Sequence, residues 1–317
     1  MKRKNLPAKK KLGNWFRAAL VAVPTLVGGY WANNRGYLDD LPLIGYTETE
    51  TDGLADRFPE SFPGATNVRK YKHSGSRYLL VHIKTTHTIT SDQFEQRREI
   101  GKVLGKQDSE SLEDINMGAM TVFDSVSGLV SGLSRLYSLD SVYIEGLTKG
   151  NDVLLNDLID EMVRVDPEVA TTRDMERMRT VARTALSKLY PDAEVPEFPQ
   201  EFASTVYTGL KATLNGRLWA APAESKATLT SALDAQSQLI HTLKQRGYDN
   251  HEIGNVFRMV DDNREDALLS LLSGAPSGNV FVVVYGAGHS WADNIKEWNR
   301  THKKDRFSLV EVNPNGL

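Results

Sequence analysis

The chain lacks cysteine altogether among its 317 residues. This absence excludes a disulfide scaffold, a zinc site with cysteine ligands, an iron–sulfur cluster and a thiol nucleophile. The G-x-S-x-G turn of serine hydrolases, the Walker phosphate-binding loop and the dinucleotide-binding G-x-G-x-x-G pattern are absent as well. The sequence therefore predicts neither a serine triad nor a nucleotide site.

Acidic residues slightly outnumber basic ones, with 41 Asp+Glu against 38 Lys+Arg, and hydrophobic residues make up 40% of the chain. This is the composition of a globular protein. The basic residues are unevenly placed, because residues 1–17 contain seven Lys or Arg and no acid, which leaves 31 basic against 41 acidic residues after them. The body is acidic, so nucleic acid is not an expected partner.

The amino-terminal segment combines this basic cluster with an apolar run, AALVAVPTLVGGYW, over residues 18–31. Positive charge before an apolar stretch is typical of a membrane signal, although a full span needs about 20 residues. Counting from Trp15, the sequence predicts an anchor over residues 15–31 that leaves the body outside the cytoplasm. The alternatives are a cleaved signal peptide, which would make the protein secreted, and a basic tail followed by a short core helix.

Composition divides the chain into three segments. Residues 1–34 form the tail and anchor, residues 35–66 read as an extended linker rich in acids and proline, and residues 67–317 form an α/β domain. At the start of that domain, VRKYK (68–72) and RYLLVHIK (77–84) have strand composition and are separated by HSGS. This pattern predicts an N-terminal β-hairpin.

Residues 117–139 are mostly apolar and long enough for a second membrane span. Asp124 lies inside this stretch, and Gly128 and Gly132 provide small side chains one helical turn apart. These features favour a buried helix that packs closely on a neighbouring element.

The rest of the domain alternates strands with helices. SVYIEGL (141–147) predicts a core strand that ends at an acid, NVFVVVYG (279–286) predicts a central parallel strand buried on both faces, and RFSLVEV (306–312) predicts a last strand after a helix at 291–302. Residues 150–260 have helical periodicity. The prediction is an α/β fold with a mostly parallel central sheet flanked by helices and a large all-helical insertion at about 150–260 between the central strands.

Three polar residues lie at or just beyond the carboxyl ends of the predicted strands: His87, Glu145 and His289. Ligands bind at this edge of open α/β sheets, because strand ends and helix amino termini leave a crevice there. Gly286 and Gly288 allow a sharp turn that presents His289 at the rim. These residues are the candidate catalytic and substrate-binding groups.

Two further residues are assigned by local pattern. Asp262 or Asn263 is a plausible N-cap of the following apolar helix, which places Arg264 in its first turn against the helix dipole, where it could reach an anionic group. His82 lies on the strand 77–84, where alternation directs its side chain into the face of the sheet, so we expect a buried histidine rather than a ligand.

The combination of IKTTHT (83–88), VYIEGL (142–147), DDNREDALLSLL (261–272) and VFVVVYGAGH (280–289) resembles the TraB, Tiki and erythromycin-esterase-like superfamily, to which the haem-binding ChaN branch is related. The resemblance covers about residues 68–312 in motif order. It implies an α/β fold with two G-x-x-H motifs, an acid at a strand end and an arginine before the second motif. Those positions correspond here to His87, Glu145, Arg264 and His289.

The first motif departs from the family pattern, because Lys84 stands where a glycine, or the glutamate of the esterase-like members, is expected. The resemblance implies several activities: metal-dependent proteolysis at membranes, ester hydrolysis, regulation of peptide pheromones, or haem binding. A cationic Lys84 near the two histidines would repel a metal and lower their basicity. It therefore favours a binding or regulatory protein without turnover.

The leading hypothesis is a membrane-anchored hydrolase that acts on a peptide or ester. His87, Glu145 and His289 would bind a divalent metal (Mn, Co or Zn) or act in acid–base catalysis, and Arg264 would hold the substrate carboxylate or the developing oxyanion, together with Gly286 and Gly288 of the turn. A non-catalytic ligand- or haem-binding protein, with His87 or His289 as axial ligand, is the alternative. A structural membrane protein that uses its helical region for contacts is the third, and the sequence leaves the oligomeric state open.

Overall fold

The computed structural model describes residues 53–87, 110–191, 200–246, 250–275 and 278–317, together with single residues between 91 and 98. Its strands form one six-stranded sheet in the order β1-β6-β2-β5-β3-β4. The strands are β1 Ala65–Tyr71, β2 Tyr78–Thr85, β3 Ser141–Thr148, β4 Trp219–Glu224, β5 Val280–Gly286 and β6 Phe307–Pro314. The helices are α3 Gly53–Asp56, α5 Leu112–Tyr137, α6 Asn151–Val165, α7 Met175–Leu189, α8 Gln200–Ala212, α9 Lys226–Arg246, α10 Asn250–Ser273 and α11 Ala292–Thr301.

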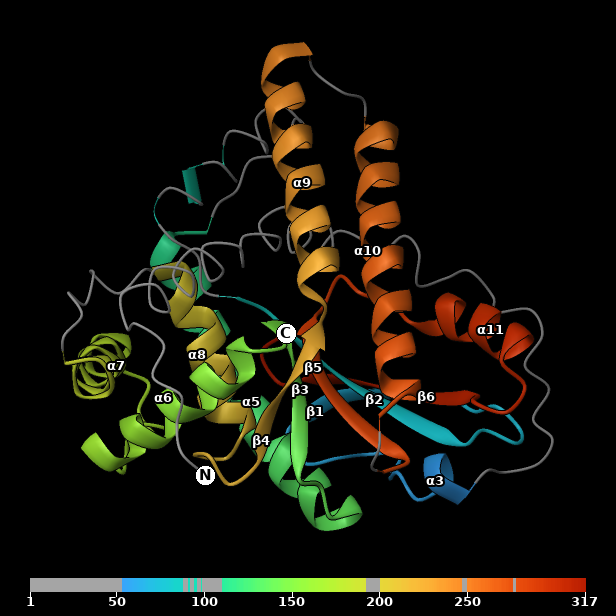
Figure 1. The fold of residues 1–317 in the computed structure, drawn as a ribbon, viewed down its shortest axis with the longest axis horizontal. Helices are drawn as coiled ribbons and strands as arrows, with labels where there is room; N and C mark the ends of the chain where they lie inside the picture. Colours follow the sequence, from blue (N-terminus) through green and yellow to red (C-terminus); the bar gives the residue numbers. More distant parts are fainter. Residues whose placement is uncertain are drawn as a thin grey trace.

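The sheet is mostly parallel and lies between layers of helices, which confirms the predicted α/β class (Figure 1). Strand β5 pairs in parallel with β2 on one side and with β3 on the other. All of its residues after Val280 are buried. The continuous apolar run VFVVVYG thus forms the central, doubly covered strand that its composition predicts.

The predicted N-terminal hairpin does not form as a hairpin. Strands β1 and β2 are both present, but β6 lies between them, antiparallel to β1 and parallel to β2. Residues Phe307–Val312 of β6 are buried, and a strand buried on both faces needs neighbours on both edges. The turn signal between β1 and β2 marks a change of direction and carries no information about a strand inserted from the other end of the chain.

The region 150–260 is largely helical but not all-helical, because it contributes strand β4 at the edge of the sheet. The strand has the sequence WAAPAE, which is poor in β-branched residues and contains Pro222. Proline cannot donate a ladder hydrogen bond and is tolerated on an edge strand. The edge position of β4 therefore permits the composition that makes this strand hard to recognise in the sequence.

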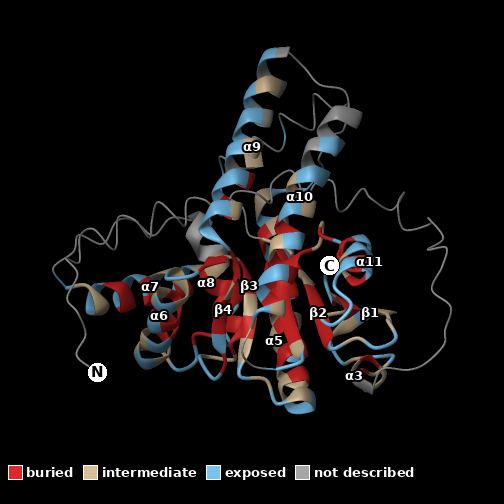
Figure 2. Ribbon diagram, turned by 45° about the vertical axis from the view of Figure 1, so that its right-hand side comes forward, coloured by how far each residue is buried: buried red, intermediate tan, exposed pale blue. Residues whose placement is uncertain are grey.

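Alternate side chains of each strand divide the core into two layers. Leu79, Val81 and Ile83 of β2 pack with apolar residues of α5, α6, α7 and α8 on one face. Tyr78 and Leu80 pack with residues of α10 and α11 on the other. In Figure 2 the buried residues concentrate in the sheet and the inner faces of these helices, whereas α9 and the adjoining part of α10 project from the body with mostly exposed side chains.

Helix α5 is the buried helix that the sequence predicts for residues 117–139. It presents Phe123, Leu129 and Leu133 to the core. Gly132 is the point of close packing, because a Cβ there would lie 2.5 Å from the ring of Phe62. Gly128 has nothing within 4 Å of such a Cβ, so the close approach is confirmed for one of the two glycines.

The predicted linker 35–66 overlaps the folded body. Helix α3 begins at Gly53, and Ala55 and Phe58 are almost fully buried in the core. The domain therefore starts well before residue 67. Residues 1–52, which include the predicted tail and the anchor over residues 15–31, lie outside the described residues. Within the described part of the chain, no helix is long and apolar enough to cross a bilayer.

Candidate active site at the carboxyl edge of the sheet

The four predicted site residues come together at one place. Glu145 lies near the end of β3, His87 two residues after β2, His289 in the turn after β5, and Arg264 on α10, which packs over this edge of the sheet. Contacts of 3.7 Å or less join Glu145 to His87, to Arg264 and to His289. Residues separated by more than 200 positions in the chain thus form a single cluster.

The backbone at the end of β3 determines where Glu145 points. The pairing of β3 with β4 shifts register between Ile144 and Thr148, and Gly146 has a φ of 75°, a conformation that favours glycine. Its N–H donates to Oε1 of Glu224 over 2.8 Å. This bulge leaves the Glu145 carboxylate on the same side of the sheet as α10.

Arg264 joins two carboxylates at the centre of the cluster. Its Nη2 donates to Glu145 Oε1 over 2.9 Å and to Glu224 Oε1 over 2.6 Å, and its Nε donates to Glu224 Oε2 over 3.1 Å. The guanidinium carbon also lies 5.1 Å from the ring centroid of Tyr285. Arg264 is 3% exposed. Burial alone would lower the pKa of Arg264, but Glu224 and Glu145 outweigh burial and raise it.

The expected position of Arg264 in a first helical turn is wrong. Helix α10 begins at Asn250, so Arg264 lies in its interior and the preceding Asp262 and Asn263 do not cap it. The acidic and amide residues that suggest a cap instead belong to a polar stretch beside the site. Asp261, for example, has its carboxylate 3.8 Å from His289 Nε2. The location beside carboxylates, rather than a helix end, explains why an arginine is placed here.

His289 is surrounded by acids. Its Nδ1 lies 2.9 Å from Glu265 Oε1, and its Nε2 lies 3.7 Å from Glu145 Oε1 and 3.4 Å from Nη1 of Arg264. Burial disfavours the charged ring, yet Asp261, Glu145 and Glu265 together raise the pKa of His289 to about 10. His289 is therefore an imidazolium near neutral pH. It cannot accept from Arg264, so two N–H donors face each other there.

Glu265 holds the second nitrogen of His289 in place. Its Oε1 also accepts from the N–H of Ser290 over 3.2 Å. Burial raises the pKa of Glu265 to about 7, although the hydrogen bond and charge of His289 act in the opposite direction. This carboxyl group thus titrates close to neutral pH, which is unusual for glutamate.

His87 is the most accessible of the four predicted residues, with 13% of its side chain exposed. Its Nε2 lies 3.2 Å from Glu145 Oε2. The same oxygen accepts from the N–H of Gly286 over 2.7 Å. Burial alone would raise the pKa of Glu145, but the hydrogen bonds of His289 and His87 and the charge of Arg264 hold it well below its usual range. The carboxylate is ionised and accepts, so Nε2 of His87 is the donor.

The glycine turn after β5 brings its backbone into contact with the Glu145 carboxylate. A Cβ on Gly286 would lie 3.1 Å from Glu145 Oε2, so a side chain there would press on the carboxylate. The N–H of Ala287 donates to the carbonyl of Thr85, which ties the turn to the end of β2. Gly288 lies in the same turn before His289.

Sequence reasoning missed three acids of this cluster: Glu224, Glu265 and Asp261. Glu224 ends the unpredicted strand β4, and a strand that ends at an acid beside the sheet edge is the signal that identifies Glu145. Glu265 and Asp261 lie one residue after and three residues before Arg264. On a helix that runs through this segment, Asp261 lies one turn before both Arg264 and Glu265, which would have placed it near each of them.

The donor set suggested for a divalent metal does not fit one in this arrangement. Glu145 Oε1 accepts from Arg264, and both ring nitrogens of His289 face carboxylates or the guanidinium. Among the described residues, no group of three or more His, Asp or Glu side chains is placed to hold a metal ion. The same contacts engage the nitrogens through which His289 would bind haem iron, and Nε2 of His87 is engaged by Glu145.

His82 is the buried histidine that alternation predicts. It is 0% exposed, and its Nε2 lies 3.1 Å from the carbonyl oxygen of Tyr285. Lys84 extends from the same face of β2, where its charge acts on His82 and on Glu311 of β6. Lys84, which the sequence analysis expects beside His87 and His289, thus lies close to His82 and to Glu311 of β6.

Comparisons with known proteins match nothing: no family model, no curated protein and no solved structure corresponds to this chain.

Proposed function

We propose that this protein hydrolyses an ester or peptide bond without a bound metal, with His87 as the general base that activates water. The observation that carries the proposal is the His87–Glu145 pair at the mouth of the cluster. A histidine oriented by a buried carboxylate is the arrangement that hydrolases use to remove a proton from water or a hydroxyl group. The resemblance to the esterase-like superfamily agrees with this reaction class but is not its basis.

The hydrogen bond to Glu145 assigns the proton positions on His87. Because Nε2 donates to an ionised carboxylate, a neutral imidazole carries its lone pair on Nδ1. In the proposed reaction, Nδ1 takes a proton from water as the water oxygen attacks the carbonyl carbon. The same nitrogen then returns the proton to the leaving oxygen or nitrogen as the tetrahedral intermediate collapses. Glu145 is the positioning residue and stabilises the imidazolium that forms in between.

The facing donors of Arg264 and His289 suit the negative charge that develops on the carbonyl oxygen. Nη1 of Arg264 and Nε2 of His289 are 3.4 Å apart, so one oxygen can accept from both. Both cations are fixed by buried carboxylates before substrate arrives, which is the preorganisation that makes such donors effective. Loss of one donor of this kind typically costs about 10²–10³ in kcat.

The proposal also includes a location, which follows from the anchor predicted near the amino terminus. A basic cluster followed by the apolar run at 15–31 would hold the enzyme on a membrane with its body outside the cytoplasm, where peptide and ester substrates are available. This part rests on the amino-acid sequence alone.

The experiment is a hydrolysis screen with the full chain on p-nitrophenyl esters and fluorogenic peptides. Activity should persist in EDTA and fall at least about 10²-fold in His87→Ala. His241→Ala is the matched control, because His241 is an exposed histidine on α9 outside the cluster and its loss should change nothing. Activity abolished by EDTA and restored by Mn²⁺ or Zn²⁺ would refute the metal-free reaction.

A second candidate is a binding protein that keeps the fold without turnover. One observation favours it: Arg264, Glu145 and Glu224 satisfy one another, which is also how a purely structural buried ion cluster is built. If neither substrate class is hydrolysed, and a titration with haemin gives no Soret shift, a small-molecule ligand of the same edge becomes the better account.

A further inference from the structure

A crevice between α9 and α10 reaches the candidate site at Arg264. It has a volume of about 350 Å³, near the lower end of the roughly 300–1,000 Å³ typical of ligand pockets. Arg264 forms one end of it, and Met259 and Val260 of α10 form part of its wall. The lining residues are Ala227, Thr228, Ser231, Ala232, Ala235, Met259, Val260, Asn263 and Arg264.

The lining combines aliphatic side chains with uncharged polar groups and one cation, Arg264. Three alanines, a methionine and a valine supply apolar surface, the hydroxyl and amide groups are uncharged, and no carboxylate lines the crevice. Met259 is 57% exposed, so a large thioether side chain stands at the rim with most of its surface in water. A flexible methionine is well suited to cover aliphatic groups of different shape.

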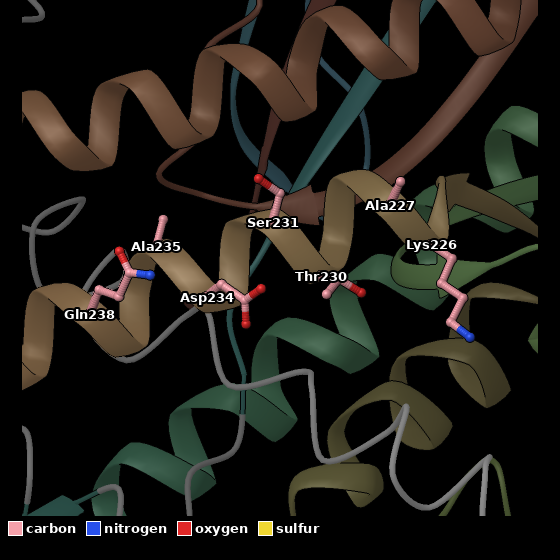
Figure 3. A pocket seen from close by; sticks show the side chains of 7 residues that line it. All are labelled: Lys226, Ala227, Thr230, Ser231, Asp234, Ala235 and Gln238. Atoms are coloured by element: carbon pink, nitrogen blue, oxygen red, sulfur yellow. The ribbon is translucent and has the colours of Figure 1, made fainter.

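Helix α9 presents a different face to the outside. In Figure 3, Ala227, Ser231 and Ala235 lie on the side of α9 that faces the neighbouring helix, whereas Thr230 and Asp234 point away from it. The four-residue spacing within each set is what places each on its own stripe of the helix. Thr230 and Asp234 line, together with the inward residues Ala227, Ser231 and Ala235, a wider groove of about 750 Å³ along the length of α9. Arg264 lines the narrow crevice and is absent from the lining of the wider groove, so the crevice is the hollow that reaches the candidate site.

The position of the crevice relative to the His87–Glu145 pair determines which part of a substrate would enter it. The leaving group must receive its proton from His87, which follows β2, and β5 and β3 separate β2 from β4 and from the helix α9 that follows β4. In the proposed reaction the carbonyl oxygen binds at Arg264, which also lines the crevice. The acyl side of the scissile bond therefore extends between α9 and α10.

We propose that this crevice binds a short aliphatic acyl chain and makes the enzyme selective for esters or amides of such acids. The inference rests on the proposed function where it is tested by ester hydrolysis. A binding experiment tests the crevice without requiring hydrolysis. The turnover probes are p-nitrophenyl acetate and p-nitrophenyl hexanoate. The binding probe is hexanamide, which places an uncharged amide at the site and a five-carbon alkyl chain in the crevice.

The test compares the full chain with two tryptophan variants. Asn263→Trp fills the crevice from an exposed position on α10, and Thr230→Trp is the matched control on the outward stripe of α9. Asn263→Trp should lower kcat/KM for the hexanoate roughly tenfold or more and leave the acetate within about twofold, since pocket complementarity discriminates by such factors. Thr230→Trp should keep the wild-type ratio of the two esters. An unchanged ratio of kcat/KM between the two esters in Asn263→Trp would refute the proposed acyl pocket.

The binding readout separates this failure from that of the proposed function. With ¹³C-methyl-labelled methionine, the Met259 signal should shift on titration with hexanamide in the wild-type chain and not in Asn263→Trp. If no ester is hydrolysed but this shift is seen, the crevice stands and the hydrolase proposal fails. If esters are hydrolysed without the shift, the hydrolase stands and the acyl pocket is refuted.

Discussion

Replacement of Arg264 by methionine tests the buried ion cluster most sharply. Methionine keeps an unbranched chain of similar length but removes the charge from between Glu145 and Glu224, which are both less than 10% exposed. Glu145 retains two other donors, the N–H of Gly286 and Nε2 of His87. Glu224 retains the N–H of Gly146. The main cost is therefore one uncompensated buried carboxylate at Glu224.

Removing one partner of a buried ion pair typically costs about 3–5 kcal/mol, and we expect Arg264→Met to lose about that much free energy of unfolding at pH 7. Urea denaturation followed by circular dichroism measures it. The double variant Glu224→Gln/Arg264→Met should recover a large part of the loss, because the unpaired charge is gone. Arg258→Met, an exposed arginine on the same helix, is the control and should leave the midpoint nearly unchanged.

The sign of the pH dependence adds a second check on this variant. Without the guanidinium, the buried Glu224 carboxylate has lost its cation, and burial favours the neutral, protonated form of a carboxyl group. The folded state then binds a proton more readily, so its deficit relative to wild type shrinks as the pH falls from 7 towards 4.5. A deficit that stays constant over this range, or a destabilisation no larger than that of Arg258→Met, would refute the assignment of a buried charge cluster.

Three further predictions concern single positions. The pKa of Glu265 is raised to about 7, so its contribution to stability is fully present below pH 4.5 and is lost as the pH rises through 7. Thermal melts at pH 5 and pH 8 should therefore show a loss of unfolding free energy between these pH values that is smaller by roughly 1–3 kcal/mol in Glu265→Gln than in wild type. Gly286→Ala places a Cβ 3.1 Å from Glu145 Oε2, which displaces the carboxylate that orients His87. This variant should lower kcat while its melting temperature stays close to that of wild type, which kinetics and thermal melts of the same sample measure. Gly132→Ala overpacks against Phe62 and should cost about 1–3 kcal/mol in urea titrations while leaving activity unchanged.

Strong local patterns made the central part of the fold predictable. The run VFVVVYG predicts β5, and SVYIEGL predicts β3 with Glu145 near its end, because such apolar β-branched stretches have few other stable placements. The pairing of β1 with β6 depends on contacts between the two ends of the chain, which no local pattern encodes. The hairpin prediction failed for this reason.

The candidate site was half predictable. His87, Glu145 and His289 are visible in sequence because each follows or ends a recognisable strand. Glu224 is not, since its strand is rich in alanine and contains Pro222, and edge strands tolerate such composition. The residues before Arg264 were misassigned as a helix start, because Asp and Asn just before an apolar stretch are the residue types that cap helices, whereas here they lie inside α10.

The most direct test of the central claim is a single-turnover hydrolysis with the full chain in excess over an ester from the screen, in which mass spectrometry of quenched samples looks for an acyl group on the protein. Direct attack by water on the carbonyl carbon, assisted by His87, predicts that acid and alcohol are released together without acylated protein and that His87→Ala forms product at least about 10²-fold more slowly. Acylated protein that accumulates before the acid appears would mean that an oxygen of the protein attacks instead. That result, or an unchanged rate in His87→Ala, would contradict the proposed mechanism.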